Sequence, residues 1–521
     1  MHLMNPAARP RSGRRRAGHW KGATNLASRP SKRRIAIIGA GFTGSVLAAH
    51  LLRGAAEPTS IHLIERAPSV GTGLAYSTPN SAHVLNVRAY NMSAFPDDPR
   101  HFLRWLWARD DDRENGGAAG AVPPSGHAFV SRARYGAYIQ DVLREAQAAA
   151  PPHVSLTVTR GEVVGLSQDG DGGRNGDGAI RLRLGTGPSL NVDLAALCVG
   201  NFPPSPPGAA DPEVLASDRF VAAPWDWQAL AAIDPDAPVL ILGTGLTMVD
   251  TVLTLEDQGH RGPILALSRR GLLPAVHEET RPFKCFVHPQ VMPHTVLDVL
   301  IALKADVRRA RAAGLDWRSA FDALRPYHHL IWKNLPMEER RRFLRHARPY
   351  WEILRHRMAP EVAARIGALV ANGRLTIRAG RLRALRLVPG GVEATVRARG
   401  AEDSVWTRRA GAVINATGTE CDFGRIGHPL VRALLDHGLA RPDPLRLGLD
   451  VTEDGALIGE DGCASRRLFA LGPVSRPPFW EMTAVPELRS QCAAAARHLI
   501  GLSVADRQPM PLRAPRARVS P

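Results

Sequence analysis

A glycine-rich turn between two apolar segments constrains the fold of this chain more than any other feature. An apolar run at residues 35–38 leads directly into Gly39-Ala40-Gly41-Phe42-Thr43-Gly44, and an Ala-rich segment with helical character follows. A second apolar run, residues 61–64, ends in Glu65, 21 residues after Gly44. Strand, glycine turn, helix, strand and acid in this order predict a dinucleotide-binding βαβ unit.

Each part of this unit has a physical role. Gly39 allows the tight turn, Gly41 lets the backbone approach a pyrophosphate, and Gly44 lets the helix pack closely on the strand. The helix N-terminus offers free N–H groups and a positive dipole end to the phosphates. Glu65 stands where a carboxylate can accept hydrogen bonds from ribose hydroxyls. The alternative is a glycine-rich turn that holds no ligand.

Length and charge narrow the class of protein. A chain of 521 residues predicts two or three domains. The formal net charge is +18, but fourteen positive charges lie in residues 1–34 and 507–521, which contain no acidic residue. The rest of the chain therefore carries about +4, so we predict solvated tails and no specific nucleic-acid partner.

The five cysteines are widely spaced and form no CxxC pair. They indicate neither a zinc ribbon nor a redox dithiol, so we predict no metal site. Their spacing favours a reducing compartment, and the sequence contains no convincing membrane span, so we predict a cytoplasmic protein.

The segment after the first unit mixes loops, helices and strands. The Gly71-Thr72-Gly73 turn is expected to bring backbone close to a ligand. Polar groups and apolar side chains are mixed without a regular period over residues 86–98. This pattern suits a loop that packs over a pocket, or a loop with a purely structural role. Further predicted elements are helices at 102–107 and 134–149, β-meander strands at 154–158, 162–166, 180–184 and 191–199, and surface loops at 110–126 and 167–178.

A second glycine unit begins near Pro238. A strand at 239–242 leads into Gly243-Thr244-Gly245, a helix runs to about Asp257, and the next strand ends in Ser268-Arg269-Arg270. Met248 replaces the third glycine, so looser or shifted helix packing is expected. An arginine at this strand end favours a ribose 2′-phosphate, hence NADPH over NADH, although both arginines suit a solvated surface as well.

The remaining chain is predicted to return to the first domain. Residues 294–372 have a helical pattern, and strands follow at 374–399 and 404–415. The second of these strands leads into Ala416-Thr417-Gly418. A last strand at 467–471 meets Gly472-Pro473, and residues 485–500 predict the final helix.

Two glycine units 204 residues apart, with a late Ala-Thr-Gly segment, resemble the two-dinucleotide-domain flavoproteins. Closer local similarity, to a bacterial FAD/NAD(P)-binding family, lies in Glu65-Arg66 with Gly71-x-Gly73, in the 91–98 stretch, and in Ser268-Arg269-Arg270-Gly271 with His277. The FAD domain of that family is similar to FAD-dependent urate hydroxylase and more distantly to ornithine and lysine N-hydroxylases. The implied fold is α/β, with two Rossmann-like, doubly wound, three-layer domains, a β-meander and a helical insert.

The resemblance also implies a division of the chain. The predicted parts are a basic tail (1–32), a discontinuous FAD domain (33–202 and 405–503), an NAD(P)H domain (236–293 and 373–404), a helical insert (294–372) and a second tail (504–521). The residues implied at the FAD site are Gly39, Gly41, Phe42, Thr43, Gly44, Glu65, Arg66, Gly73, Thr417, Gly418 and Gly472. Those implied at the NADPH site are Gly243, Gly245, Ser268 and Arg269.

The expected activity is NADPH-driven reduction of FAD, followed by reaction with O₂ and hydroxylation of a small polar nitrogenous substrate through a flavin hydroperoxide. Asn91, Ser93, Asp97 and His277 are candidate polar groups, but each also suits a structural role, so no acid–base residue is assigned. Two alternatives stay open: a flavin reductase or dehydrogenase that serves an electron carrier, and a nucleotide-binding sensor or assembly protein. The sequence does not decide whether the chain forms a homo-oligomer.

Overall fold

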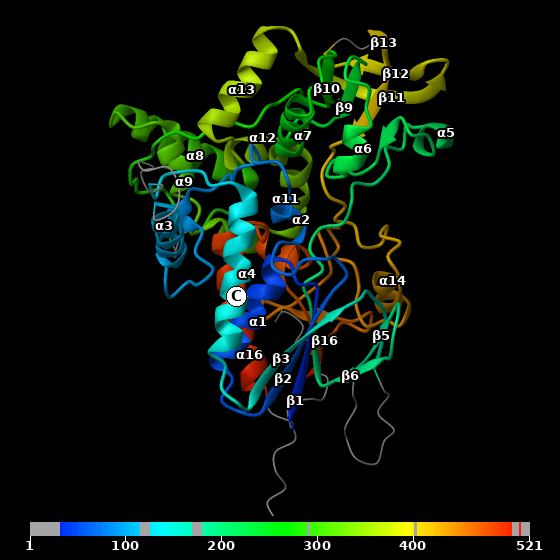
Figure 1. Ribbon diagram of the computed structural model, residues 1–521. Helices are drawn as coiled ribbons and strands as arrows, with labels where there is room; N and C mark the ends of the chain where they lie inside the picture. The colour runs from blue at the N-terminus through cyan, green and yellow to red at the C-terminus, as the bar shows by residue number, and fades with distance from the viewer. Residues whose placement is uncertain are drawn as a thin grey trace, which may run out of the picture.

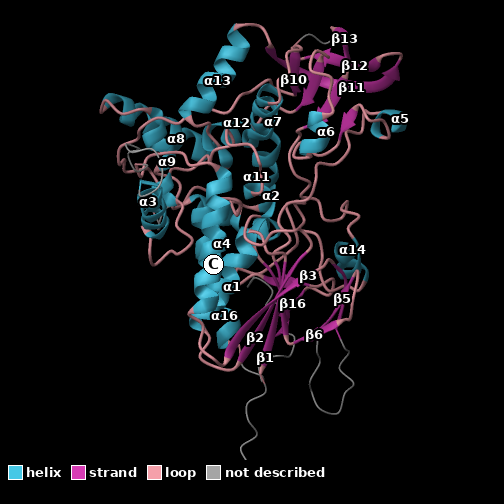
Figure 2. Cartoon of the chain, in the orientation of Figure 1, coloured by secondary structure: helices cyan, strands magenta, loops and turns pink. Residues whose placement is uncertain are grey.

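The structure is a computed structural model that describes residues 32–114, 125–168, 180–288, 292–400, 404–502 and 510–511. The predicted tails (1–32 and 504–521) and the predicted surface loops (110–126 and 167–178) lie largely outside these residues. Two separate sheets organise the described chain, one at each end of the molecule, with helices beside and between them (Figure 2).

The first sheet is built around the opening apolar run. Its strand order is β15-β16-β7-β1-β2-β3, and β17 pairs with β16. β1, β2, β3, β7 and β16 run parallel, whereas β15 and β17 are antiparallel to β16. The strands are β1 (Arg33–Ile38), β2 (Thr59–Glu65), β3 (Val154–Arg160), β7 (Leu194–Leu197), β15 (Ala456–Ile458), β16 (Cys463–Ala470) and β17 (Met510–Pro511).

Different layers cover the two faces of this sheet. Helices α1 (Phe42–Gly54), α4 (Arg132–Ala148) and α16 (Val485–Gly501) lie side by side on one face (Figure 1). The other face is covered by an antiparallel sheet of β4 (Val163–Gln168), β5 (Ile180–Leu184) and β6 (Leu190–Val192), together with α14 (Pro429–Asp436). α1 is buried along nearly its whole length because it is clamped between the sheet, α4 and α16.

The predicted β-meander included two strands that belong to the main sheet. β3 was predicted to be its first strand, but β3 pairs parallel with β2 in the main sheet. The predicted strand at 191–199 divides into β6 and β7, and β7 inserts between β1 and β16. The apolar pattern of these strands is the same in either sheet, so it could not decide their partners.

The second sheet has the order β13-β12-β11-β10-β9-β14-β8. Its strands are β8 (Phe220–Val221), β9 (Val239–Leu242), β10 (Ile264–Ser268), β11 (Leu375–Val388), β12 (Gly391–Ala398), β13 (Val405–Ala410) and β14 (Ala412–Asn415). β8, β14, β9, β10 and β11 are parallel, and β12 and β13 continue as an antiparallel edge. β13 pairs with β12 and β14 pairs with β9, so both strands belong to this sheet. The sheet therefore continues to Asn415, ten residues beyond residue 405, where the FAD domain was predicted to resume.

Helices cover this second sheet as well. α7 (Leu246–Asp257), α13 (Pro360–Ala371) and the short α6 (Trp227–Ala231) share a core with one face, and α5 (Pro212–Leu215) packs on the other. Met248, in place of a third glycine, is fully buried in the first of these cores. The two domains are joined by Arg132, whose guanidinium binds both carboxylate oxygens of Asp250 on α7 at 2.7 and 3.1 Å.

The helical insert sits between the two sheets and contacts both domains. It contains α8 (Val296–Ala312), α9 (Trp317–Asp322), α10 (His328–Asn334), α11 (Met337–Arg342), a π-helical turn (Phe343–Ala347) and α12 (Arg348–Arg355). Short elements elsewhere are α2 (Gly73–Tyr76), a 3₁₀ turn (Ala89–Asn91), α3 (His101–Glu114), a 3₁₀ turn (Gly472–Ser475) and α15 (Arg476–Phe479). Two parallel-sheet domains, a β-meander and a helical insert confirm the predicted fold class. None of the described helices is long and apolar enough to cross a membrane.

Candidate functional site

The first glycine turn lies at the carboxyl end of β1, where the chain reverses into α1. Gly39 has a φ of +98°, and a Cβ on it would stand 2.4 Å from the Cys198 carbonyl oxygen. A Cβ on Gly44 would stand 1.9 Å from the Gly39 carbonyl oxygen. Only glycine at these two positions lets α1 start directly against the sheet.

Gly41 is the residue from which α1 begins, and no side chain caps this helix end. The N–H groups of its first turn, at Phe42, Thr43 and Gly44, therefore have no intrahelical partner. They stand at the positive end of the helix dipole, a position that favours a negatively charged group.

Two other backbone segments approach this helix end without side chains. The Gly71 N–H donates to the Ala40 carbonyl oxygen at 2.7 Å, and a Cβ on Gly73 would stand 3.0 Å from the Gly41 Cα. On another side, a Cβ on Gly472 would stand 2.8 Å from the Thr43 Oγ1. The glycines thus leave a cradle of bare backbone around the start of α1, which fits the phosphates of FAD.

The acid at the end of β2 is tied to the same turn. Glu65 Oε2 accepts from the Ala40 N–H at 2.6 Å, and Oε1 accepts from the Ala67 N–H at 2.8 Å. Each oxygen keeps a lone pair, so a ribose hydroxyl can still bind there. Arg66 instead points to Glu162, 3.1 Å away, and its side chain is 62 % exposed. The structure therefore places Arg66 in a surface ion pair, and its contact with FAD stays a prediction.

The second glycine turn borders a cavity of about 630 Å³. Gly243, Gly245, Ser268 and Arg269, the four residues predicted for NADPH, all line it. α7 begins from Gly245 without a side-chain cap, so its first N–H groups face the cavity, as those of α1 face the first cradle. This cavity fits a second dinucleotide.

Thr417 and Gly418 occupy a different place from the one predicted. They line the second cavity, where they were expected at the FAD site. The reason is that β14 pairs parallel with β9, so the carboxyl ends of both strands meet at one edge. A Cβ on Gly243 would stand only 2.2 Å from the Ala416 carbonyl oxygen, which shows how closely the two turns approach.

The two arginines after β10 differ in environment. Arg269 is exposed at the cavity rim. Arg270 is half-buried, its Nε has no hydrogen-bond partner among the described residues, and its guanidinium lies 5.7 Å from the centre of the Tyr350 ring. Both residues line the cavity next to the second glycine turn.

Replacing Arg269 with alanine is expected to raise the KM for NADPH about tenfold and to leave the KM for NADH nearly unchanged. The lost charge interacts only with the 2′-phosphate that NADH lacks. Steady-state kinetics with both nucleotides measure the difference. Arg386→Ala, at an exposed position far along β11, is the matched control. Equal effects on the two nucleotides would contradict the assignment.

The helical insert supplies a wall of the second cavity that the sequence analysis missed. Pro349, Glu352, Ile353 and His356 line the cavity from α12 and from the residue that follows it. Their spacing of three, four and seven residues places them on one helix face. The sequence analysis predicted a helical pattern for this segment but assigned none of these residues to a site.

The 86–98 loop is a packed structural element. The Ser93 hydroxyl donates to the Asp98 carbonyl oxygen at 2.6 Å and accepts from the Phe95 N–H. His277 lies 3.0 Å from the Asn86 carbonyl oxygen, and burial lowers its pKa to about 4. Asp97 is exposed. None of these residues has the arrangement of a general base.

The connection between β16 and α16 contains a strained residue. Trp480 has a φ of +63° and a ψ of −59°, and the Glu481 N–H donates to the Phe479 carbonyl oxygen at 2.8 Å, which forms a γ-turn. The buried indole stacks on Trp332 of α10, with ring centres 4.8 Å apart. The Arg476 guanidinium also lies over the Trp480 ring, 4.5 Å from the ring centre. The insert thus holds a backbone conformation that a bulky residue rarely adopts.

The γ-turn places Glu481 in a buried ionic cluster. Its Oε2 accepts from Arg355 Nε at 2.8 Å and its Oε1 from Trp351 Nε1 at 2.5 Å. Burial would raise the pKa of this carboxyl, but the attraction of the Arg355 guanidinium and the hydrogen bond from Trp351 act against it, and the pKa falls to about 2. The carboxylate is therefore charged in the folded protein at every physiological pH.

We expect Glu481→Gln to flatten the acid side of the stability profile. The folded pKa lies below the unfolded value near 4.3, so this group stabilises the fold above pH 4.3 and ceases to do so as the pH falls toward 2. The linked free energy is about 3 kcal/mol, which a glutamine cannot provide. Urea midpoints measured between pH 2 and 7 should fall more steeply for the wild type than for the variant. Parallel profiles would contradict this expectation.

Comparison with known proteins supports the FAD side of the site. Residues 36–202 match the model of the FAD-NAD(P)-binding family. An L-aspartate N-monooxygenase (nitrosuccinate-forming) of Streptomyces cremeus is 29 % identical over 265 residues, which cover 45 % of this chain and 38 % of that protein. The chain therefore aligns with well under half the length of this relative.

Solved structures share the whole architecture. An ornithine hydroxylase of Pseudomonas aeruginosa in its reduced form is 16 % identical, with a TM-score of 0.58 over 90 % of this chain and 98 % of that one. The Kutzneria sp. 744 ornithine N-hydroxylase, with reduced FAD, NADP⁺ and L-ornithine, is 14 % identical, with a TM-score of 0.59 over 89 % and 98 %. A cadaverine monooxygenase of Erwinia amylovora bound to FAD is 14 % identical, with a TM-score of 0.58 over 94 % of this chain and 99 % of that one. These likenesses confirm the fold of a two-dinucleotide-domain flavoprotein.

Proposed function

We propose that this chain, whose residues 36–202 belong to the FAD-NAD(P)-binding family, is an FAD- and NADPH-dependent monooxygenase that hydroxylates a nitrogen of a small substrate. In the overall reaction NADPH gives up two electrons, one atom of O₂ enters the new N–O bond, and the other leaves as water.

One observation carries this proposal. Two helices, α1 and α7, each begin from an uncapped glycine at the carboxyl end of a parallel strand, and each presents free N–H groups to a cradle or cavity. A single site of this kind serves one dinucleotide, whereas two in one chain suit a flavin and its nicotinamide reductant.

The nature of the relatives supports the choice of reaction. The sequence relative acts on L-aspartate, and the structural neighbours are named for ornithine and cadaverine. All of these molecules carry an aliphatic amino nitrogen. A small amine nitrogen is therefore the part of the substrate that we assign to this chain.

The bound flavin would supply the redox chemistry, and the residues of the chain bind and orient the partners. The first turn of α1 binds the phosphates, and Glu65 accepts from the ribose hydroxyls. Arg269 and Arg270 select the 2′-phosphate of NADPH at the opposite end. The chain offers five free cysteines and no disulfide, which supports our placement of the protein in the cytoplasm.

The test follows NADPH oxidation, oxygen uptake and hydroxylamine formation together, with a panel of amines and amino acids. A substrate that gives one hydroxylamine per NADPH and per O₂ supports the monooxygenase. NADPH oxidation that yields only hydrogen peroxide with every compound would contradict it and favour a flavin reductase. Bound flavin that NADPH never reduces would favour a non-catalytic role.

A further inference from the structure

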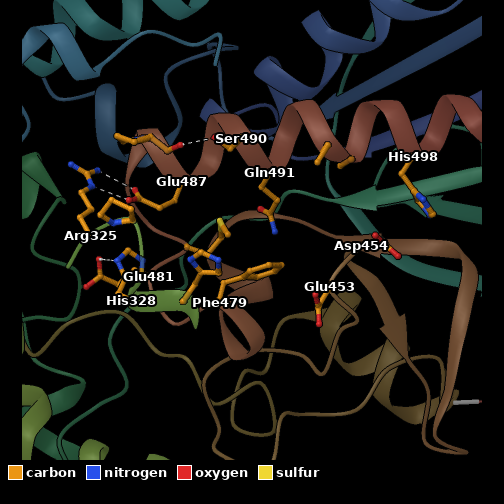
Figure 3. Close-up of a pocket in the computed structure, with 16 residues that line it drawn as sticks. Arg325, His328, Glu453, Asp454, Phe479, Glu481, Glu487, Ser490, Gln491 and His498 are labelled. Atoms are coloured by element: carbon orange, nitrogen blue, oxygen red, sulfur yellow. Dashed lines mark hydrogen bonds and ion pairs between the residues drawn. The ribbon is translucent and has the colours of Figure 1, made fainter. Parts of the chain in front are cut away.

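Another cavity, distinct from the nucleotide cavity, lies where the helical insert meets the first domain. It has a volume of about 500 Å³ and runs along one face of α16, to which Glu487, Gln491, Ala494 and His498 contribute (Figure 3). α10 and the residues just before it form the opposite wall. The volume is sufficient for a small organic molecule.

This cavity adjoins the first glycine turn. Gln491 lines it, and the Oε1 of the same side chain accepts from the Gly472 N–H at 2.8 Å. Gly472 in turn packs against Thr43 in the first turn of α1. Gln491 therefore connects the wall of this cavity to the glycine that borders the proposed FAD cradle.

A buried histidine in the cavity wall has an unsatisfied nitrogen. His328 is 5 % exposed, and its Nδ1 has no hydrogen-bond partner among the described residues. The nearest acid oxygen, Glu481 Oε2, is 3.8 Å away and already accepts from Arg355. Burial lowers the pKa of His328, so the imidazole is neutral. An unpaired buried polar atom of this kind is costly unless a ligand completes it.

The charges around the cavity are paired with one exception. Arg325 binds Glu487 through two hydrogen bonds of 3.0 and 3.2 Å, and Lys333 binds Glu453. Asp454 is exposed at the rim and has no partner among the described residues. No arginine or lysine of the described lining is left to bind a ligand carboxylate, whereas one carboxylate is left to bind an ammonium group.

The rest of the wall is apolar. Phe479 and Met482 face the cavity from the segment that precedes α16, and Pro326 and Ala494 lie on the two walls. Such a surface suits an alkyl chain, which gains by leaving water. Neutral imidazole, free carboxylate and apolar wall together describe a ligand with an amino group and a carbon chain.

We infer that the cavity between α10 and α16 binds the substrate, and that this substrate is an aliphatic amine without a carboxylate group. This inference rests on the proposed function and makes it more specific. It separates the chain from its sequence relative, which acts on an amino acid with two carboxylates. Asp454 would bind an ammonium group of the substrate at the rim of the cavity. The unpaired Nδ1 of His328 would form a hydrogen bond with another polar group of the amine.

The test is an equilibrium titration of the FAD-loaded, full-length protein with cadaverine, L-ornithine and L-aspartate, in the absence of NADPH. Changes in the flavin absorption spectrum and in heat report binding. Cadaverine is expected to bind at least tenfold more tightly than L-aspartate. His328→Ala and Asp454→Asn are each expected to raise the Kd for cadaverine about tenfold. Asp218→Asn, the same charge change at an exposed site outside the cavity, is expected to leave the Kd unchanged.

The outcomes separate this inference from the proposed function. Tighter binding of L-aspartate, or a cadaverine Kd that neither variant changes, would overturn the inference. Hydroxylamine formation from L-aspartate would then leave the proposed function intact. Conversely, cadaverine binding that both variants weaken, without NADPH-driven hydroxylamine formation, would support the cavity and overturn the monooxygenase. If His328→Ala does not fold, Asp454→Asn decides alone, because this exposed side chain supports no packing.

Discussion

Replacing Gly41 with valine is expected to give a protein that folds but purifies without flavin. A Cβ at this position would stand 3.4 Å from the Gly73 Cα, so the backbone tolerates it with little adjustment. The two methyl groups beyond it would occupy the space before the first turn of α1, where a pyrophosphate must approach. The flavin-to-protein ratio, from absorption at visible wavelengths and at 280 nm, measures the effect.

The control is the same substitution at a glycine without a ligand nearby. Gly367 lies in α13, and a Cβ there would meet nothing within 4 Å. Gly367→Val should therefore keep the wild-type flavin content. A normal flavin content in Gly41→Val would remove the assignment of the first cradle to FAD.

Replacing Gly245 with valine is expected to keep the flavin and to abolish efficient use of NADPH. Gly245 has a φ of −84°, which any residue adopts, and a Cβ there would meet nothing within 4 Å. The fold thus accepts valine, but the side chain would project toward the nucleotide cavity. We expect the KM for NADPH to rise about 100-fold, which corresponds to about 2.7 kcal/mol.

Stopped-flow reduction and steady-state kinetics measure this loss, and the flavin content shows that the first domain is intact. Gly427→Val is the matched control, because Gly427 is exposed in the first domain and has the same free space around its Cα. An unchanged KM for NADPH in Gly245→Val would show that the cavity does not hold the nucleotide.

The sequence predicted best what is local. The second unit shows this clearly, since the predicted strand at 239–242 and the helix ending near Asp257 agree with β9 and α7. A glycine turn between an apolar strand and a helix determines its own geometry through φ angles and close contacts, which the residue types reveal. The same holds for Gly73, whose approach to Gly41 follows from the absence of both side chains.

What the sequence did not predict depends on pairing between distant segments. The sequence did not place β3 and β7 in the main sheet, because the strands with which they pair lie over 90 residues away in the chain. Thr417 and Gly418 line the nucleotide cavity, and not the predicted FAD site, because β14 pairs with β9. The face of α12 that lines this cavity, and the γ-turn at Trp480, depend on how the insert docks. No periodicity in the chain encodes such docking.

The most direct test of the central claim is a visible absorption spectrum of the purified protein, repeated without oxygen after NADPH is added. Our account predicts flavin bands that bleach with NADPH and return when oxygen is admitted. Bands that persist after NADPH would contradict the role of the second cavity. A protein without flavin, even after incubation with FAD, would contradict the first cradle and with it the proposed activity.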